Sequence, residues 1–361
     1  MKRINVTKTF LPPIEEYQAY LQQIWDNGQV TNQGPLLLEL ESKLQDYLKV
    51  ENLHLVSNGT AALQIALNSL EITEGEIITT PFSYVATTSA ILWERCQPVF
   101  VDIEPDTFCI DATKIEAAIT SKTKAILAVH VFGNPCDVEA IEAIAKKHSL
   151  KVIYDAAHAF NVEYKGKSLL SYGDISICSF HATKLFHTVE GGCLVTNDPN
   201  VSERAELIKR FGHNGDEHYL LGINAKASEM HAAMGLCNLK YVKELIQKRK
   251  VASDSYQAAL GDSFKSLALR EGTTPNYGYY PVVLKDEAAV KKVLKALAEQ
   301  DIYPRRYFYP SLNELPYVGG KQSCPISEKI ANSIICVPLY ADLEDAIIQE
   351  VCKVLLKDGN G

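Results

Sequence analysis

Short apolar runs alternate with longer amphipathic segments between about residues 50 and 200. The short runs predict strands at Leu53–Ser57, Glu76–Thr80, Pro98–Asp102, Ala125–Val131, Lys151–Asp155, Ile175–Ser179 and Cys193–Thr196. The longer segments predict helices at Ala61–Leu70, Tyr84–Cys96, Val138–His148 and Val201–Lys209. Because strands separated by helices need right-handed crossovers, we expect an α/β fold with a mostly parallel sheet covered on both faces.

The pattern changes after about residue 228. A long helix from Ser228 to about Leu260 is predicted to link a large unit, residues 1–245, to a smaller α+β unit, residues 246–361. At the other end of the chain, Pro12-Pro13 and Gly34-Pro35 predict an irregular arm around a single helix, Ile14–Asn27. The smaller unit is expected to hold a strand and then three helices, at Tyr277–Leu284, Glu287–Glu299, Ser327–Ile335 and Leu343–Leu356.

Composition narrows the class of protein. A chain of 361 residues with 47% hydrophobic content can fill one large core and a smaller one. No apolar run approaches the roughly 18–20 residues of a membrane span, and the N-terminus lacks a signal-peptide pattern. The nine cysteines are scattered without a C-x-x-C pair, which is typical of reduced, buried thiols rather than metal ligands. We therefore expect a cytoplasmic protein, and the net charge of −8 argues against a nucleic-acid partner.

Three polar motifs follow predicted strands, where ligands gather on parallel sheets. Gly59-Thr60 opens a helix, and its backbone N–H groups suit a phosphate, although in isolation the motif is more often an ordinary turn with an N-cap. Asp155 ends a strand, where its carboxylate could pair with a protonated pyridine nitrogen or serve as a helix N-cap. Lys184 lies in a turn after a strand, between Ser179 and Gly191-Gly192, and could supply an amine nucleophile. Together these parts predict a site for pyridoxal phosphate (PLP).

Several longer stretches resemble the DegT/DnrJ/EryC1/StrS sugar aminotransferases. The resemblance implies fold-type I PLP-dependent transferases that act on nucleotide-linked keto-sugars. It covers most of the chain and lies in Ser57-Asn58-Gly59-Thr60, Pro81-Phe82-Ser83-Tyr84-Val85-Ala86-Thr87, Tyr154-Asp155-Ala156-Ala157-His158, Ser179-Phe180-His181-Ala182-Thr183-Lys184, Glu190-Gly191-Gly192 and residues 222–233.

The resemblance also implies roles for single residues. Tyr84 would stack on the pyridine ring, and His158 would lie near the ring hydroxyl. Asn224 would reach the phosphate of the neighbouring subunit's cofactor, which makes a homodimer necessary. Structural alternatives stay open for all three: a buried helix start, a core histidine and a helix cap. The phosphate would be bound by Gly59, Thr60 and Ser179.

The lysine separates two branches of the family. Sugar dehydratases that resemble these enzymes carry histidine in place of the Schiff-base lysine, so Lys184 favours transamination although His181 and His187 are nearby. Residues 181–188 are similar to enzymes that make a 4-amino-4,6-dideoxyhexose on dTDP for surface polysaccharides. The implied substrates are glutamate and dTDP-4-dehydro-6-deoxyglucose. The alternatives are a dehydratase or 3-aminotransferase of the same family, or a regulator that binds without catalysis.

The sequence gives weaker evidence for substrate-binding residues than for cofactor-binding residues. Arg305, Arg306 and Tyr309 could contact the diphosphate and the sugar, because arginine pairs suit phosphate oxygens, yet arginines beside aromatic residues are also common on surfaces. His181 is a further candidate in the lysine motif. A nicotinamide enzyme is disfavoured because no G-x-G-x-x-G follows the first strand, and metal hydrolysis because H-E-x-x-H is absent.

Overall fold

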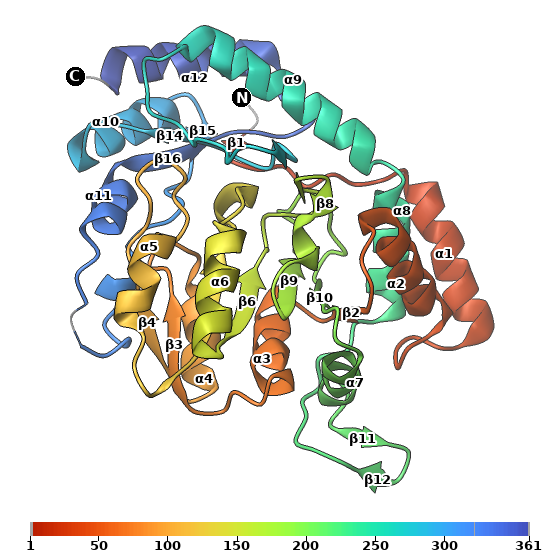
Figure 1. The fold of residues 1–361 in the computed structure, drawn as a ribbon. Helices are drawn as coiled ribbons and strands as arrows, with labels where there is room; N and C mark the ends of the chain where they lie inside the picture. The colour runs from red at the N-terminus through yellow and green to blue at the C-terminus, as the bar shows by residue number, and fades with distance from the viewer. Residues whose placement is uncertain (1–2, 321, 360–361) are drawn as a thin grey trace.

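A seven-stranded sheet forms the centre of the molecule in a computed structural model that describes residues 3–320 and 322–359 (Figure 1). All neighbouring pairs are parallel except those of β10, which is antiparallel to β2 and β9. The expected mostly parallel α/β fold is therefore confirmed. The strands lie in the order β2 (Leu53–Val56), β10 (Gly192–Val195), β9 (Ile175–Ser179), β6 (Lys151–Asp155), β5 (Thr123–Val129), β3 (Gly75–Thr79) and β4 (Cys96–Phe100).

Alternating side chains along the strands build a core on each face of the sheet. Ile153 and Ile177 belong to the cluster with α3 (Gly59–Ser69), α4 (Val85–Trp93) and α7 (Pro199–Ile208). Their neighbours Tyr154 and Cys178 belong to the other cluster, which contains residues of α2 (Pro35–Leu48), α5 (Ala112–Ile115), α6 (Val138–His148) and α8 (Glu229–Leu239). Because Asp155 and Ser179 are two residues beyond Ile153 and Ile177, both end on the face of α3 and α4.

The C-terminal part has a core of its own. It gathers buried side chains from α9 (Val242–Leu260), α10 (Glu287–Ala298), α12 (Asp345–Asp358) and the antiparallel pair β14 (Tyr280–Val283) and β16 (Ile334–Val337). The N-terminal strand β1 (Ile4–Asn5) pairs in parallel with β15 (Ile302–Tyr303). This separate core supports our division of the chain near residue 245, which stays a proposal.

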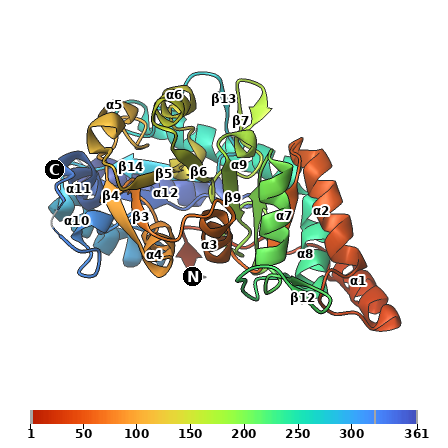
Figure 2. The same ribbon diagram turned by 60° about the horizontal axis from the view of Figure 1, so that its bottom comes forward.

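The single helix expected over Ser228–Leu260 is wrong. Two helices, α8 and α9, meet at Lys240 and Tyr241. Lys240 forms an ion pair with Glu16 of α1 (Ile14–Asn27) at 2.6 Å, and the hydroxyl of Tyr241 donates to the same carboxylate. This anchored turn lets α8 pack beside α1 and α2 while α9 crosses the C-terminal part (Figures 1 and 2).

Of the elements that were not expected, two contribute buried residues to the cores. The helix α2 follows directly after Gly34, and its leucines at positions 36, 37, 40, 44 and 48 are all buried. The strand β16 takes up residues that were assigned to the end of a helix, because α11 (Pro325–Ser333) stops at Ser333. The other expected elements are present with ends shifted by up to three residues.

Across the described residues, every helix is too short or too polar to span a membrane.

Shorter elements complete the chain. The remaining pieces are the strands β7 (Glu163–Tyr164), β8 (Lys167–Ser168), β11 (His213–Asn214), β12 (Glu217–His218) and β13 (Thr273–Thr274), and the 3-10 turns Glu116–Ala118, Val131–Gly133, Leu169–Ser171 and Leu312–Glu314.

Candidate active site

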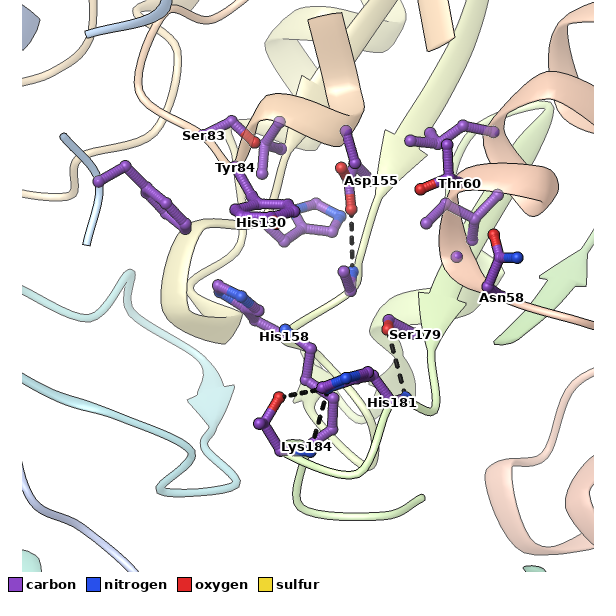
Figure 3. A pocket seen from close by; sticks show the side chains of 18 of the residues that line it. Asn58, Thr60, Ser83, Tyr84, His130, Asp155, His158, Ser179, His181 and Lys184 are labelled. Atoms are coloured by element: carbon purple, nitrogen blue, oxygen red, sulfur yellow. Dashed lines mark hydrogen bonds between the residues drawn. The ribbon is translucent and has the colours of Figure 1, made fainter. Parts of the chain in front are cut away.

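A cavity of about 260 Å³ lies at the carboxyl ends of the parallel strands (Figure 3). Most of the predicted site residues line it, although they come from distant parts of the chain. Asn224, Arg306 and Tyr309 are not among the lining residues. The predicted residues that do line the cavity are Gly59, Thr60, Tyr84, Asp155, His158, Ser179, His181, Lys184 and Arg305.

The first turn of α3 forms one side of the cavity. The side chain of Asn58 caps this helix by accepting a hydrogen bond from the Ala61 N–H at 2.8 Å. A Cβ on Gly59 would lie 3.1 Å from the Cβ of Ser179, so glycine lets the helix start pack closely against the end of β9. First-turn N–H groups have no acceptor within their own helix, and the helix dipole adds positive potential there. Gly59, Thr60 and Ser179 therefore form a place suited to an anion.

Asp155 is a buried carboxylate held by two hydrogen-bond donors. Its side chain is 5% exposed and accepts hydrogen bonds from Thr87 Oγ1 at 2.8 Å and from the Ala157 N–H at 3.1 Å. Burial raises the pKa of Asp155, and these two donors oppose the shift. Residues 156–162 form turns and no helix, so the helix-cap alternative does not hold. Among the described residues no cation forms an ion pair with this carboxylate, so a cation in the cavity would stabilise it.

Lys184 lies in the loop between β9 and β10. Its side chain is partly buried, and its Nζ donates a hydrogen bond to the hydroxyl of Tyr279 at 3.2 Å. Burial lowers the pKa of Lys184, while Tyr307 and Asp155 oppose the shift. A lowered pKa increases the fraction of neutral amine, which is the nucleophilic form.

Tyr84 and His158 lie around the same cavity. Tyr84 precedes α4 and is 55% exposed, so it is not the buried aromatic of a helix start. His158 accepts a hydrogen bond from the Phe132 N–H through Nδ1 at 3.3 Å, and its ring stacks on that of Phe308 at a centroid distance of 5.6 Å. Burial lowers the pKa of His158 well below its usual value, so the ring is neutral with its proton on Nε2.

The three C-terminal candidates fall into two groups. Arg305 lines the cavity and lies over the ring of Tyr307 at 5.0 Å. Arg306 instead pairs with Glu287 at 3.1 Å and covers the ring of Tyr309. Both Arg306 and Tyr309 are thus engaged with each other outside the cavity.

Two other candidates lie at the edge of the site or beyond it. His181 is within 3.5 Å of the Glu190 carboxylate and 2.8 Å of the Thr183 hydroxyl, at the rim of the cavity. Asn224 is exposed and accepts a hydrogen bond from Lys226 Nζ at 2.7 Å. It is not placed as a helix cap, because Ser228 caps α8.

Sequence reasoning missed several residues of the site. Thr87, the partner of Asp155, belongs to the recognised stretch 81–87, and its position one helical turn after Ser83 was a usable signal. Tyr279 and Tyr307 come from the C-terminal part, and no local pattern connects them with Lys184. The cavity thus brings together a lysine amine, a buried carboxylate and the start of a helix, the three parts that were expected of a PLP site.

Comparisons with known proteins define the family. The DegT/DnrJ/EryC1/StrS aminotransferase family matches residues 13–356, and the chain belongs to this family of PLP-dependent aminotransferases. It is 41% identical over 362 residues to dTDP-4-amino-4,6-dideoxy-D-glucose transaminase of Shigella dysenteriae, covering 98% of each chain. Among solved structures, DesI in the presence of its TDP-sugar product has a TM-score of 0.93 at 30% identity, with 98% of this chain and 92% of that chain covered. Helicobacter pylori PseC, an aminotransferase of pseudoaminic acid biosynthesis, has a TM-score of 0.91 at 28% identity, with 99% of each chain covered.

Proposed function

We propose that this aminotransferase moves an amino group from glutamate to the keto carbon of dTDP-4-dehydro-6-deoxyglucose. One structural observation carries the catalytic part: Lys184 and Asp155 face one cavity beside the start of α3. The choice of sugar is supported by the 41% identity to a transaminase named for dTDP-4-amino-4,6-dideoxy-D-glucose.

The residues of the cavity fit PLP. The buried carboxylate of Asp155 has no ion pair among the described residues, and a protonated pyridine nitrogen would supply a direct partner. Gly59, Thr60 and Ser179 would hold the phosphate at the start of α3, and Tyr84 and His158 would flank the ring. When bound, PLP serves as the electron sink that lets an amino group pass between two substrates.

Lys184 performs the acid–base work in this proposal. Its lowered pKa increases the fraction of neutral amine, the form that would hold the aldehyde of PLP if the cofactor were bound. Once an incoming amine displaces it, Nζ can accept a proton from the substrate carbon and return it at the next position. Histidine lacks an amine of this kind, so Lys184 supports transamination over dehydration.

Arg305 is proposed to bind the anionic part of a substrate. It is the one of the three C-terminal candidates that lines the cavity, and none of the ion pairs among the described residues includes it. A guanidinium in this position suits a diphosphate or a carboxylate. His181, at the rim beside Glu190, is proposed to contact the sugar.

A homodimer with shared sites completes the proposal. Asn224 lies outside its own cavity, and the apolar side chains near it are exposed, with Leu221 89% and Phe211 51% accessible. A second copy would cover these side chains and could bring its Asn224 to the phosphate. All nine cysteines are free and buried, which supports a reducing, cytoplasmic location.

The test is a donor-and-sugar assay. Protein reconstituted with PLP should convert dTDP-4-dehydro-6-deoxyglucose and glutamate to the 4-amino sugar and 2-oxoglutarate, identified by mass and NMR. A GDP-linked 4-keto-6-deoxy sugar serves as the competing substrate. A deoxygenated sugar without nitrogen would favour the dehydratase, and cofactor binding without formation of 2-oxoglutarate would favour the regulator.

Lys184→Ala should abolish both turnover and the covalent adduct trapped by borohydride. Peptide mass spectrometry locates the adduct, and Lys167→Ala, which changes an exposed lysine on strand β8, is the matched control. An adduct that persists in Lys184→Ala would remove the lysine from its proposed role.

A further inference from the structure

Tyr279 contacts the amine of Lys184, although the two residues are distant in the sequence. It lies just before β14 in the C-terminal part, whereas Lys184 lies in the loop between β9 and β10. The two side chains meet at 3.2 Å between Nζ and the hydroxyl. This is the one side-chain hydrogen bond of Lys184 among the described residues, so Tyr279 is the group that holds the amine by direct contact.

The backbone on both sides of Tyr279 is held by buried side chains. Asn276 is 3% exposed; its Nδ2 donates to the carbonyls of His158 and Phe160, and its Oδ1 accepts from the Gly278 N–H at 2.9 Å. The buried guanidinium of Arg249, on α9, donates to the Gly278 carbonyl at 3.3 Å. These contacts attach the segment to the strand end that carries His158 and to α9.

The ring of Tyr279 is held as firmly as its backbone. Its centroid lies 4.4 Å from that of His158, 5.5 Å from that of Phe132 and 5.8 Å from that of Tyr307. Phe132 adopts a left-handed backbone with φ of 55°, a conformation that costs free energy for an aromatic residue. These three rings restrict the ring of Tyr279, whose hydroxyl contacts Nζ of Lys184.

We propose that Tyr279 is a positioning residue whose hydroxyl holds Lys184 Nζ in the cavity whenever that nitrogen is not bonded to the cofactor. This inference deepens the proposed function and rests on it. Burial raises the pKa of Tyr279, so the phenol keeps its own proton. It can accept an N–H of the ammonium form or donate its O–H to the neutral amine, and no proton leaves it.

The consequence is kinetic. A lysine side chain has four rotatable bonds, and a free amine explores many positions after displacement. Holding Nζ at one point keeps it close to the atom whose proton it must take, which raises its effective concentration.

The experiment compares two adjacent tyrosines. Tyr279→Phe removes the hydroxyl and keeps the ring, whereas Tyr280→Phe makes the same change at a hydroxyl that contacts Gln257 at 3.4 Å in the C-terminal core. Cofactor-free protein is labelled with trace acetic anhydride across a pH series, and the extent of Lys184 acetylation is measured by peptide mass spectrometry.

We expect the pH of half-maximal labelling of Lys184 to fall by about one unit in Tyr279→Phe, because the buried ammonium form loses an acceptor. Tyr280→Phe should match the unmodified protein. With cofactor and substrates, Tyr279→Phe should lower kcat about tenfold with both KM values nearly unchanged.

The outcomes separate the two proposals. An unchanged labelling midpoint in Tyr279→Phe overturns the positioning role, even if the protein transfers amino groups as proposed. A shifted midpoint without turnover of the dTDP sugar keeps the contact between Tyr279 and Lys184 and rejects the substrate. Equal shifts in both variants would mean that the effect belongs to packing of β14 and would also overturn the inference.

Discussion

Asp155 remains buried because two donors from different elements oppose the cost of burial. Thr87 comes from α4 and Ala157 from the turn after β6. The hydroxyl of Thr87 also contacts that of Ser83 at 2.7 Å, which fixes its orientation. The sequence does not show that Thr87 donates to Asp155, because a threonine at the start of a helix can have many roles.

Replacing Thr87 with valine removes the donor and keeps the shape. The pKa of Asp155 should rise further because the carboxylate loses a hydrogen-bond donor, and the Kd for PLP should increase about tenfold. Absorbance titration with PLP measures this, and Thr87→Ser should restore affinity.

The adjacent Thr88 is a matched control, because its buried hydroxyl has no partner among the described residues. Thr88→Val should leave PLP affinity unchanged and raise stability by about 1 kcal/mol. Equal Kd values for Thr87→Val and Thr88→Val would contradict the role of Thr87.

At the scale of elements, α2 depends on a residue far along the chain. The buried carboxylate of Glu229 accepts hydrogen bonds from the N–H groups of Leu36 and Leu37, at 2.9 and 2.8 Å. A Cβ on Gly34 would lie 2.4 Å from the Cδ of Glu229, so glycine is needed before the helix. One carboxylate thereby joins the starts of α2 and α8.

Glu229→Ala should lower the free energy of unfolding by about 2–4 kcal/mol, because two buried N–H groups lose their acceptor. Gly34→Ala should also destabilise, by steric conflict with that side chain. Urea denaturation measures both effects. Glu39→Ala, in an i,i+4 pair with Lys43 on α2, should cost less than about 0.5 kcal/mol.

A second link between elements is ionic. Lys209 is 1% exposed and pairs with Glu206 at 2.7 Å and Glu41 at 3.2 Å, and His54 contacts Glu206 at 3.1 Å. Burial opposes ionisation of Glu206, but His54 and Lys209 outweigh it and lower its pKa to about 2. This network ties α7 to α2 and β2.

The lowered pKa of Glu206 predicts acid-dependent stability. Its contribution is fully present above the usual pKa of 4.5 and is lost as pH falls toward about 2. Glu206→Gln should therefore cost roughly 2–3 kcal/mol at neutral pH and flatten the stability profile between these values. Urea unfolding over that pH range tests this. Glu203→Gln, exposed on the same helix, should retain the slope, and a slope retained in Glu206→Gln would refute the assignment.

At the scale of the whole molecule, the cavity combines segments that are distant in sequence. The sheet brings residues 58–60, 155–158 and 179–184 to one edge, the C-terminal part adds Arg305 to the lining, and Tyr279 contacts Lys184. Asn224 stays outside, on a surface with exposed apolar side chains. In the proposed homodimer, Asn224 would complete the site of the other subunit, and this role can be tested.

Mixing two inactive variants tests the shared site. Lys184→Ala and Asn224→Ala, after dissociation and reassociation, should regain about a quarter of the full activity. Half of the dimers would be mixed, and each mixed dimer would contain one intact site. Lys184→Ala mixed with Asp155→Asn should regain none, since both residues act within one chain. Absence of recovery in the first mixture would contradict the shared site.

Local patterns in the sequence predicted the strands of the sheet and identified Lys184 and Asp155 as the candidate catalytic pair. A strand can be predicted from a short apolar run because the pattern lies within a few adjacent residues. The strands predicted at Lys151–Asp155 and Ile175–Ser179 begin and end at the same residues in the structure. The motifs around Lys184 and Asp155 could be recognised in the sequence because each consists of adjacent residues at the end of a predicted strand.

Tertiary structure decided what depends on contacts between distant segments. The chain turns at Tyr241 because Glu16 binds there, and α2 begins where Glu229 can accept its first N–H groups. Tyr279 meets Lys184 only after the C-terminal part has packed against the sheet. Local sequence patterns do not predict such pairs, because the two residues interact only after folding has brought distant segments together.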